Sequence, residues 1–239
     1  MMLRLRWFAF MLPLVGACSV GTAEESTAAI QSAVGSPMVG AVKSSVSGAT
    51  GAASCAMSRG SSSGPLIVNP AISLVFWGSY WNQSGGTSDR LGYDGAWSAI
   101  GNSPAFYNRI QEYGIGMGTY SGASVQNTGL ANNTTLAETS IQNALAAEIN
   151  AGALPAVTAN TTYVIMLPPT VTSQTDVSNG FAGHHGFFVN SSKNIYYAVI
   201  EYNSGHNYNN PVISHEISDA ATDPDTSTGY RNATGDPVT

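Results

Sequence analysis

Charged side chains are scarce in this chain. Only 9% of its 239 residues are Asp, Glu, Lys or Arg, whereas soluble domains average about 25%. The eight Lys and Arg residues form no basic run outside the N-terminal end, so they cannot build the positively charged surface that binds nucleic acid. We therefore expect no nucleic-acid partner.

Cysteines, repeats and several catalytic motifs are also few or missing. Two cysteines are too few for a disulfide-rich scaffold or a cysteine-type zinc finger. The chain has no solenoid, coiled-coil or collagen period, and no Gly-x-Ser-x-Gly or phosphate-binding loop. These absences disfavour serine hydrolases and nucleoside triphosphatases. Hydrophobic residues still make up 43% of the chain, which is enough for a sizeable core.

The N-terminal segment has the pattern of an export signal. Met1–Arg6 carries two arginines, and Trp7–Ala17 is apolar but too short to span a membrane. The segment ends with Val-Gly-Ala before Cys18, which resembles a bacterial lipobox. The resemblance implies cleavage before Cys18, acylation of its sulfur and a lipid anchor in the cell envelope. The alternative is ordinary signal-peptide cleavage, in which case the protein is exported without an anchor.

The next segment, Ser19–Ser63, contains no aromatic residue and is rich in Ser, Ala and Gly. Such a composition cannot bury enough apolar surface to offset the entropy of ordering the chain. We therefore predict a disordered tether. Cys55 lies within it and has no partner in the chain if Cys18 is acylated. The remaining residues, Gly64–Thr239, are predicted to form a single globular domain.

Hydrophobic periodicity predicts alternating strands and helices in this domain. Strands are expected at Leu66–Trp77, Ile115–Val125, Tyr163–Leu167, Phe181–Asn190 and Ile195–Tyr202. Helices are expected as two pieces within Tyr93–Tyr113, separated at Ser103-Pro104, and at Leu136–Ala151 and Pro211–Thr222. The last two strands are expected to form a hairpin through the loop Asn190–Asn194. The order β-α-β-α-β-β-β-α favours an α/β fold with a mixed sheet and packed helices, with α+β as the alternative.

The last predicted helix carries the residues with the clearest chemistry. His215 and Asp219 are four residues apart, so they lie one turn apart on one face. In the motif His-Glu-x-x-His, two histidines at this spacing bind zinc and the glutamate activates water. Here Asp219 takes the place of the second histidine. We therefore predict His215 and Asp219 as zinc ligands and Glu216 as the general base. The alternative is that Glu216 and Asp219 are polar residues of an exposed helix face and that His215 caps a neighbouring carbonyl.

Two further histidines lie next to each other on a predicted strand. Side chains of neighbouring strand residues point to opposite faces of a sheet, so only one of His184 and His185 can face the helix. We predict His185 as the third metal ligand, with both histidines as surface or packing residues as the alternative. His206 is expected to be a solvated loop residue.

Three blocks of sequence resemble one protein family. The blocks are Gly64–Pro65 with Ile72–Gly78, Gly183–Gly186 with Tyr196–Ile200, and Ser214–Glu216 with Ala221–Pro224. Together they resemble the phosphate-induced or Exordium-like family of secreted proteins. In some microbial relatives the last block carries His-Glu, a later acidic residue and Thr-Asp-Pro. The resemblance implies an extracellular location and leaves the presence of a catalytic activity open.

These observations lead to two functional hypotheses. A hairpin strand followed by a His-Glu helix resembles the catalytic half of zincins, which are zinc metallopeptidases. The first hypothesis is therefore an exported, lipid-anchored metallopeptidase whose peptide or protein substrate lies along the strand near His185. The second is a non-catalytic envelope or extracellular protein that binds a cell-wall component. Zincins usually take their third ligand from beyond the helix, so either His185 supplies it or the domain is truncated at Thr239.

Overall fold

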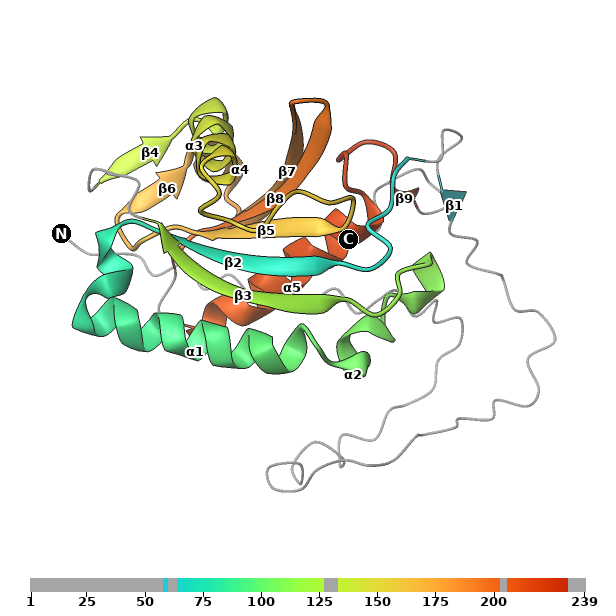
Figure 1. Ribbon diagram of the computed structural model, residues 1–239, viewed down its shortest axis with the longest axis horizontal. Helices are drawn as coiled ribbons and strands as arrows, with labels where there is room; N and C mark the ends of the chain where they lie inside the picture. The colour runs from blue at the N-terminus through green and yellow to red at the C-terminus, as the bar shows by residue number, and fades with distance from the viewer. Residues whose placement is uncertain (1–57, 60–63, 127–132, 203–205, 232–239) are drawn as a thin grey trace, which may run out of the picture. The chain divides into compact units, whose positions relative to one another are not determined.

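The computed structural model describes residues 58–59, 64–126, 133–202 and 206–231 (Figure 1). The chain divides into two units, Met1–Ala56 and Met57–Thr239, and every described residue belongs to the second. The predicted signal peptide, Cys18 and most of the predicted tether therefore lie outside the described residues.

The central element is a five-stranded sheet with the strand order β3-β2-β5-β8-β7 (Figure 1). Its strands are β2 (Ala71–Trp77), β3 (Thr119–Gln126), β5 (Thr161–Met166), β7 (Gly183–Asn190) and β8 (Lys193–Ile200). The pairs β2–β3, β2–β5 and β5–β8 are parallel, whereas β7 runs antiparallel to β8 at the edge of the sheet. The sheet is therefore mixed, and the predicted α/β class is confirmed.

Helices and short strand pairs complete this unit. The helices are α1 (Ser84–Ile100), α2 (Pro104–Tyr107), α3 (Glu138–Asn150), α4 (Gln174–Asn179) and α5 (His206–Thr222), with 3₁₀ turns η1 (Ser79–Asn82) and η2 (Gln111–Tyr113). β1 (Ser58–Arg59) pairs with β9 (Tyr230–Arg231), and β4 (Thr134–Leu136) pairs with β6 (Val171–Ser173). Among the described helices, none has the length and apolar character needed to cross a membrane.

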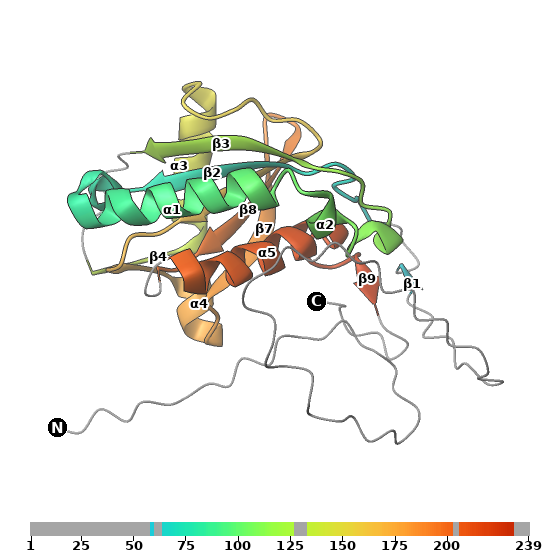
Figure 2. The same ribbon diagram turned by 90° about the horizontal axis from the view of Figure 1, so that it is seen from below.

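The sheet lies between two helical layers. Leu74 and Phe76 of β2 pack in one core cluster with residues of α1 and α5, and the alternate residues Val75 and Trp77 pack in a second cluster with residues of α3. Figures 1 and 2 show α1 and α5 together on one face of the sheet and α3 on the other. Because both faces are covered, the strands are continuous apolar runs.

The predicted order of strands and helices is present, with shifted boundaries. The break at Ser103-Pro104 is confirmed, since the Ser103 hydroxyl accepts a hydrogen bond from the Ala105 amide at 3.2 Å and caps α2. The first predicted strand begins only at Ala71, because Asn69-Pro70 interrupts the extended segment. The last helix begins earlier than predicted and contains Pro211, where proline removes a single helical hydrogen bond.

The hairpin β7–β8 is tighter than the five-residue loop that the sequence suggested. Asn190 pairs with Lys193, so only Ser191 and Ser192 form the turn. Both have positive φ, 49° and 64°, which matches a type I′ turn between twisted antiparallel strands. This turn sets the register of the hairpin, and the register decides which histidine of β7 faces which helix.

Candidate metal centre between β7 and α5

Helix α5 buries two carboxylates along with its apolar face. Ile213 and Ile217 pack in the core against the sheet and α1. Glu216 and Asp219 are only 6% and 7% exposed. The alternative that these two residues lie on an exposed polar helix face is therefore wrong. Carboxylates are rarely buried to this extent without a compensating partner.

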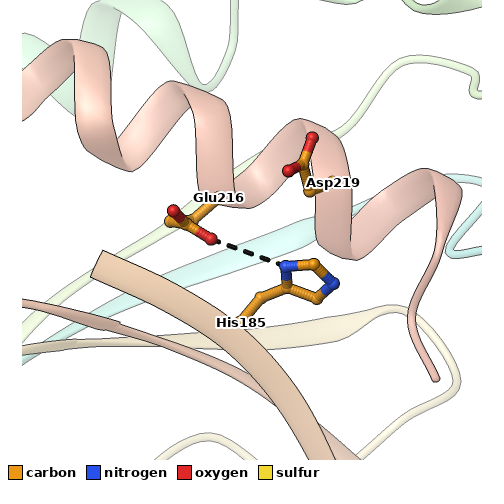
Figure 3. A group of neighbouring side chains, drawn as sticks. All are labelled: His185, Glu216 and Asp219. Carbon is orange, nitrogen blue, oxygen red and sulfur yellow. Dashed lines mark ion pairs between the residues drawn. The ribbon is translucent and has the colours of Figure 1, made fainter. Parts of the chain in front are cut away.

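His185 of β7 is the side chain that meets these carboxylates. It pairs with Ala198 of β8, which lies in the core on the α5 face of the sheet, and directly paired residues share a face. Its Nδ1 atom lies 3.5 Å from Oε2 of Glu216. Figure 3 shows the two side chains pointing toward each other between strand and helix, with Asp219 further along α5.

His185, Glu216 and Asp219 form a group of potential cation ligands. One potential ligand atom from each residue lies within 4.8 Å of the other two. A tetrahedral zinc ion with bonds of about 2.0–2.1 Å separates its ligand atoms by about 3.4 Å, close to the 3.5 Å between His185 and Glu216. Imidazole nitrogen and carboxylate oxygen are both zinc ligands. These three side chains could therefore hold a divalent ion.

The loop after α5 fixes the orientation of the His185 ring. The Nε2 atom lies 3.1 Å from the backbone oxygen of Asp223, and because a carbonyl can only accept, Nε2 must carry a proton. The Asp223 carboxylate in turn accepts hydrogen bonds from the backbone amides of Thr228 and Gly229 at 3.2 and 2.7 Å. The Nδ1 atom is therefore the nitrogen presented to Glu216, as metal-binding histidines with a backbone partner require.

Proton affinities in the cluster are shifted by burial and charge. Burial lowers the pKa of His185, but the carboxylates of Glu216 and Asp219 and the Asp223 carbonyl outweigh burial and raise it. Burial also raises the pKa of Asp219 to about 6, opposed by His215 and His185 and assisted by Glu216. Both groups bind protons more tightly than usual in the metal-free protein, so an ion would bind in competition with protons.

His215 lies at the outer side of this cluster. Its Nε2 atom is 3.4 Å from Oδ2 of Asp219, and 41% of its side chain is exposed. The structure thus brings the predicted ligands His215 and Asp219 into contact, and it places the predicted base Glu216 beside the predicted ligand His185. Which of the four residues bind an ion stays a prediction. The side chain of His206 lies outside the described residues.

A second charged cluster lies on the opposite face of β7. His184 pairs with Val199, which belongs to the core on the α3 face. Its Nδ1 atom lies 2.8 Å from Oδ1 of Asp176 on α4, and its Nε2 atom lies 3.1 Å from Oε2 of Glu138 on α3. The prediction that the two histidines face opposite ways is confirmed. The two carboxylate partners of His184 were not predicted.

This second cluster is a partly buried ion network: the side chain of Asp176 is 0% exposed, that of His184 is 10% exposed and that of Glu138 is 31% exposed. Burial lowers the pKa of His184, but hydrogen bonds and charges from Asp176 and Glu138 raise it to about 9. Burial raises the pKa of Glu138, but His184 and the hydroxyl groups of Tyr197 and Thr175 lower it to about 2. The two ring nitrogens of His184 are engaged by different carboxylates, so the arrangement is a charged clamp rather than a cation site.

Comparisons with known proteins give no relative: no protein-family model, curated protein or solved structure matches the chain. The resemblance to Exordium-like proteins therefore stays a prediction, and the function is argued from the two clusters around β7.

Proposed function

We propose that this protein is a metal-dependent peptidase whose ion lies between β7 and α5. The observation that supports the proposal is the half-buried imidazole of His185 at 3.5 Å from Glu216, with Asp219 in the same group. Two carboxylates and an imidazole buried together are costly unless their charges are compensated. A divalent cation such as zinc supplies the missing positive charge and accepts both ligand types, imidazole nitrogen and carboxylate oxygen.

The cluster allows two assignments of roles. In the first, His185, His215 and Asp219 bind the ion, and Glu216 takes a proton from the attacking water. Zinc, when bound, lowers the pKa of that water and polarises the substrate carbonyl. A second assignment of roles uses the same cluster: Glu216 is the third ligand, and the more exposed His215 accepts the proton. Both assignments retain His185 and Asp219 as ligands.

The position of β7 favours an extended peptide as the substrate. The strand order places β7 at the edge of the described sheet, with β8 on its inner side. An edge strand offers backbone donors and acceptors with which a peptide can pair as an added strand. Pairing along β7 would bring peptide carbonyls next to His185 and Glu216. A peptide therefore suits this site better than a small, compact substrate.

Metal content and hydrolysis of the purified full chain test the proposal. The wild type is expected to bind one zinc ion per chain and to cleave casein or a mixed peptide library in a chelator-sensitive way. His185→Ala and Asp219→Ala should lose both properties. Ser214→Ala is the matched control on α5, because among the described residues its hydroxyl donates to the Pro211 carbonyl of the same helix and contacts none of the candidate ligands. A folded wild type without metal would contradict the proposal and favour the non-catalytic binding protein.

Glu216→Gln separates the two assignments of roles. If Glu216 is the base, the variant keeps its zinc and loses hydrolysis by about 10²–10⁴-fold, the usual contribution of general acid–base catalysis. If Glu216 is a ligand, zinc and activity are lost together. Chelator-sensitive hydrolysis at the wild-type rate in this variant would exclude both roles for Glu216.

We also propose that the peptidase is exported and anchored to a membrane through acylated Cys18. The support is the charged, apolar and Cys-terminated pattern of residues 1–18, and two or more acyl chains give stable anchoring. Radiolabelled palmitate should label the wild type and not Cys18→Ala. Labelling of Cys18→Ala, together with its retention in the membrane fraction, would contradict the anchor.

A further inference from the structure

We propose that Glu138, His184 and Asp176 act as a positioning clamp that holds β7 so that His185 faces Glu216. In this view His184 is a positioning residue for the metal centre, although it lies on the opposite face of the sheet. The inference rests on the proposed function for its meaning, but its geometry can be tested without a metal.

Both ring nitrogens of His184 are hydrogen-bonded within the clamp. Asp176 on α4 bonds Nδ1 at 2.8 Å, and Glu138 on α3 bonds Nε2 at 3.1 Å. The side chains of His184 and Asp176 are 10% and 0% exposed. Two partners from different elements fix both the position and the rotation of the ring, which one hydrogen bond could not do.

The partner carboxylate Glu138 is itself fixed. The Thr175 hydroxyl donates to its Oε2 atom at 2.8 Å, and the Tyr197 hydroxyl of β8 donates to Oε1. Gln142 donates to the same Tyr197 oxygen at 3.0 Å. The clamp therefore ties α3, α4 and β8 to β7 through one continuous set of hydrogen bonds.

The backbone of β7 transmits this restraint to His185. The β7 backbone is paired with β8 on one side only, so within the described sheet the other side offers no backbone support. Neighbouring strand residues project to opposite faces, so a twist or shift of β7 that frees His184 also moves His185. A displaced His185 would lose both its 3.1 Å contact with the Asp223 carbonyl and its 3.5 Å contact with Glu216.

A suitable control carboxylate lies on the same helix as Glu138. Glu148 of α3 accepts a hydrogen bond from the Trp77 indole at 3.0 Å. Trp77 belongs to β2, which is separated from β7 by β5 and β8 in the sheet. Glu148→Gln therefore removes a comparable part-buried carboxylate charge of α3, keeps an oxygen that can accept from Trp77, and does not touch β7.

The first measurement is zinc affinity, determined by competition with a chromophoric chelator, beside the urea midpoint of each full-length variant. His184→Gln and Glu138→Gln should weaken zinc binding by up to about 10–100-fold, the span seen when a group that orients a metal ligand is lost. Glu148→Gln should bind zinc as the wild type does, even where its urea midpoint falls equally. Equal zinc affinity in His184→Gln and the wild type, or equal weakening in Glu148→Gln, would overturn the inference.

The second measurement needs no metal. Long-range ¹H–¹⁵N spectra of the histidine rings in the metal-free protein should show a proton on Nε2 of His185 in the wild type and in Glu148→Gln. In Glu138→Gln and His184→Gln, that signal should average or shift, because the ring is no longer held against Asp223. An unchanged His185 signal in both variants would refute the clamp. A wild type that binds no zinc would refute the proposed function and leave this second test intact.

Discussion

Replacing Asp219 by Asn is expected to stabilise the metal-free protein at neutral pH. Asp219 is 7% exposed, and burial raises its pKa from 3.8 to about 6. Each pKa unit corresponds to about 1.4 kcal/mol, so the ionised carboxylate costs the folded state on the order of 1–3 kcal/mol above pH 6. Asparagine keeps the size of the side chain and removes the charge. Asp219→Asn should therefore raise the free energy of unfolding by a similar amount.

The effect has a definite pH window. The folded state binds the Asp219 proton more tightly than the unfolded state, so this group lowers stability as the pH rises from 3.8 to about 6. Below pH 3.8 the carboxyl group is neutral in both states, and the advantage of asparagine disappears. The gain of the variant should be complete at pH 8 and close to zero at pH 3.5.

Urea denaturation in the presence of a chelator, followed by tryptophan fluorescence, measures this difference at both pH values. Asp225→Asn is the control, because its effect on stability should have the opposite sign. Partial burial raises the pKa of Asp225, but hydrogen bonds from Thr228 and Ser227 lower it overall. The ionised Asp225 therefore stabilises the folded state, and this variant should lose stability at pH 8. Saturating zinc should stabilise the wild type and not Asp219→Asn, which reverses their order. A less stable Asp219→Asn at pH 8, or an equal gain at both pH values, would refute the reasoning.

Three further predictions concern the framework around the site. Gly183→Ala should destabilise the protein by about 1–3 kcal/mol, because a Cβ there would lie 2.8 Å from the Val199 backbone oxygen; Gly95→Ala in α1 meets nothing within 4 Å and should stabilise it in the same denaturation assay. Ile217→Ala should cost about 2–5 kcal/mol, since the side chain is 1% exposed in the core. Ser103→Ala should cost about 1 kcal/mol through the lost cap of α2. A urea midpoint equal to that of the wild type in Ile217→Ala or in Ser103→Ala would contradict the expectation for that variant.

Elements with a long apolar pattern could be predicted from the sequence, and short polar ones could not. The run from Thr161 to Met166 is fully buried, and Ile141 and Leu145 face the core at helical spacing. Helix α4 has six mostly polar residues, which is too short for a period to be visible. Its absence from the prediction also concealed Asp176, and with it the clamp on His184.

Some features of the candidate site could be predicted from the sequence, and others could not. The spacing of His215 and Asp219 within one helix places them on one face whatever the tertiary structure. In the structure the Nε2 atom of His215 lies 3.4 Å from the Oδ2 atom of Asp219. The burial of Glu216 depends on how α5 packs against the sheet, which no local pattern reveals. Sequence reasoning therefore identified these residues but could not show that the two carboxylates are buried.

The choice between His184 and His185 depends on the hairpin turn. Alternation along β7 requires that one of them face α5, and the pairing of His185 with Ala198 decides which one. That pairing follows from the two-residue turn at Ser191 and Ser192. A shift of register by one residue would move every side chain of β7 to the other face, and His184 would then meet Glu216. The two-residue turn, which lies outside the candidate site, thus determines which histidine reaches the carboxylates of α5.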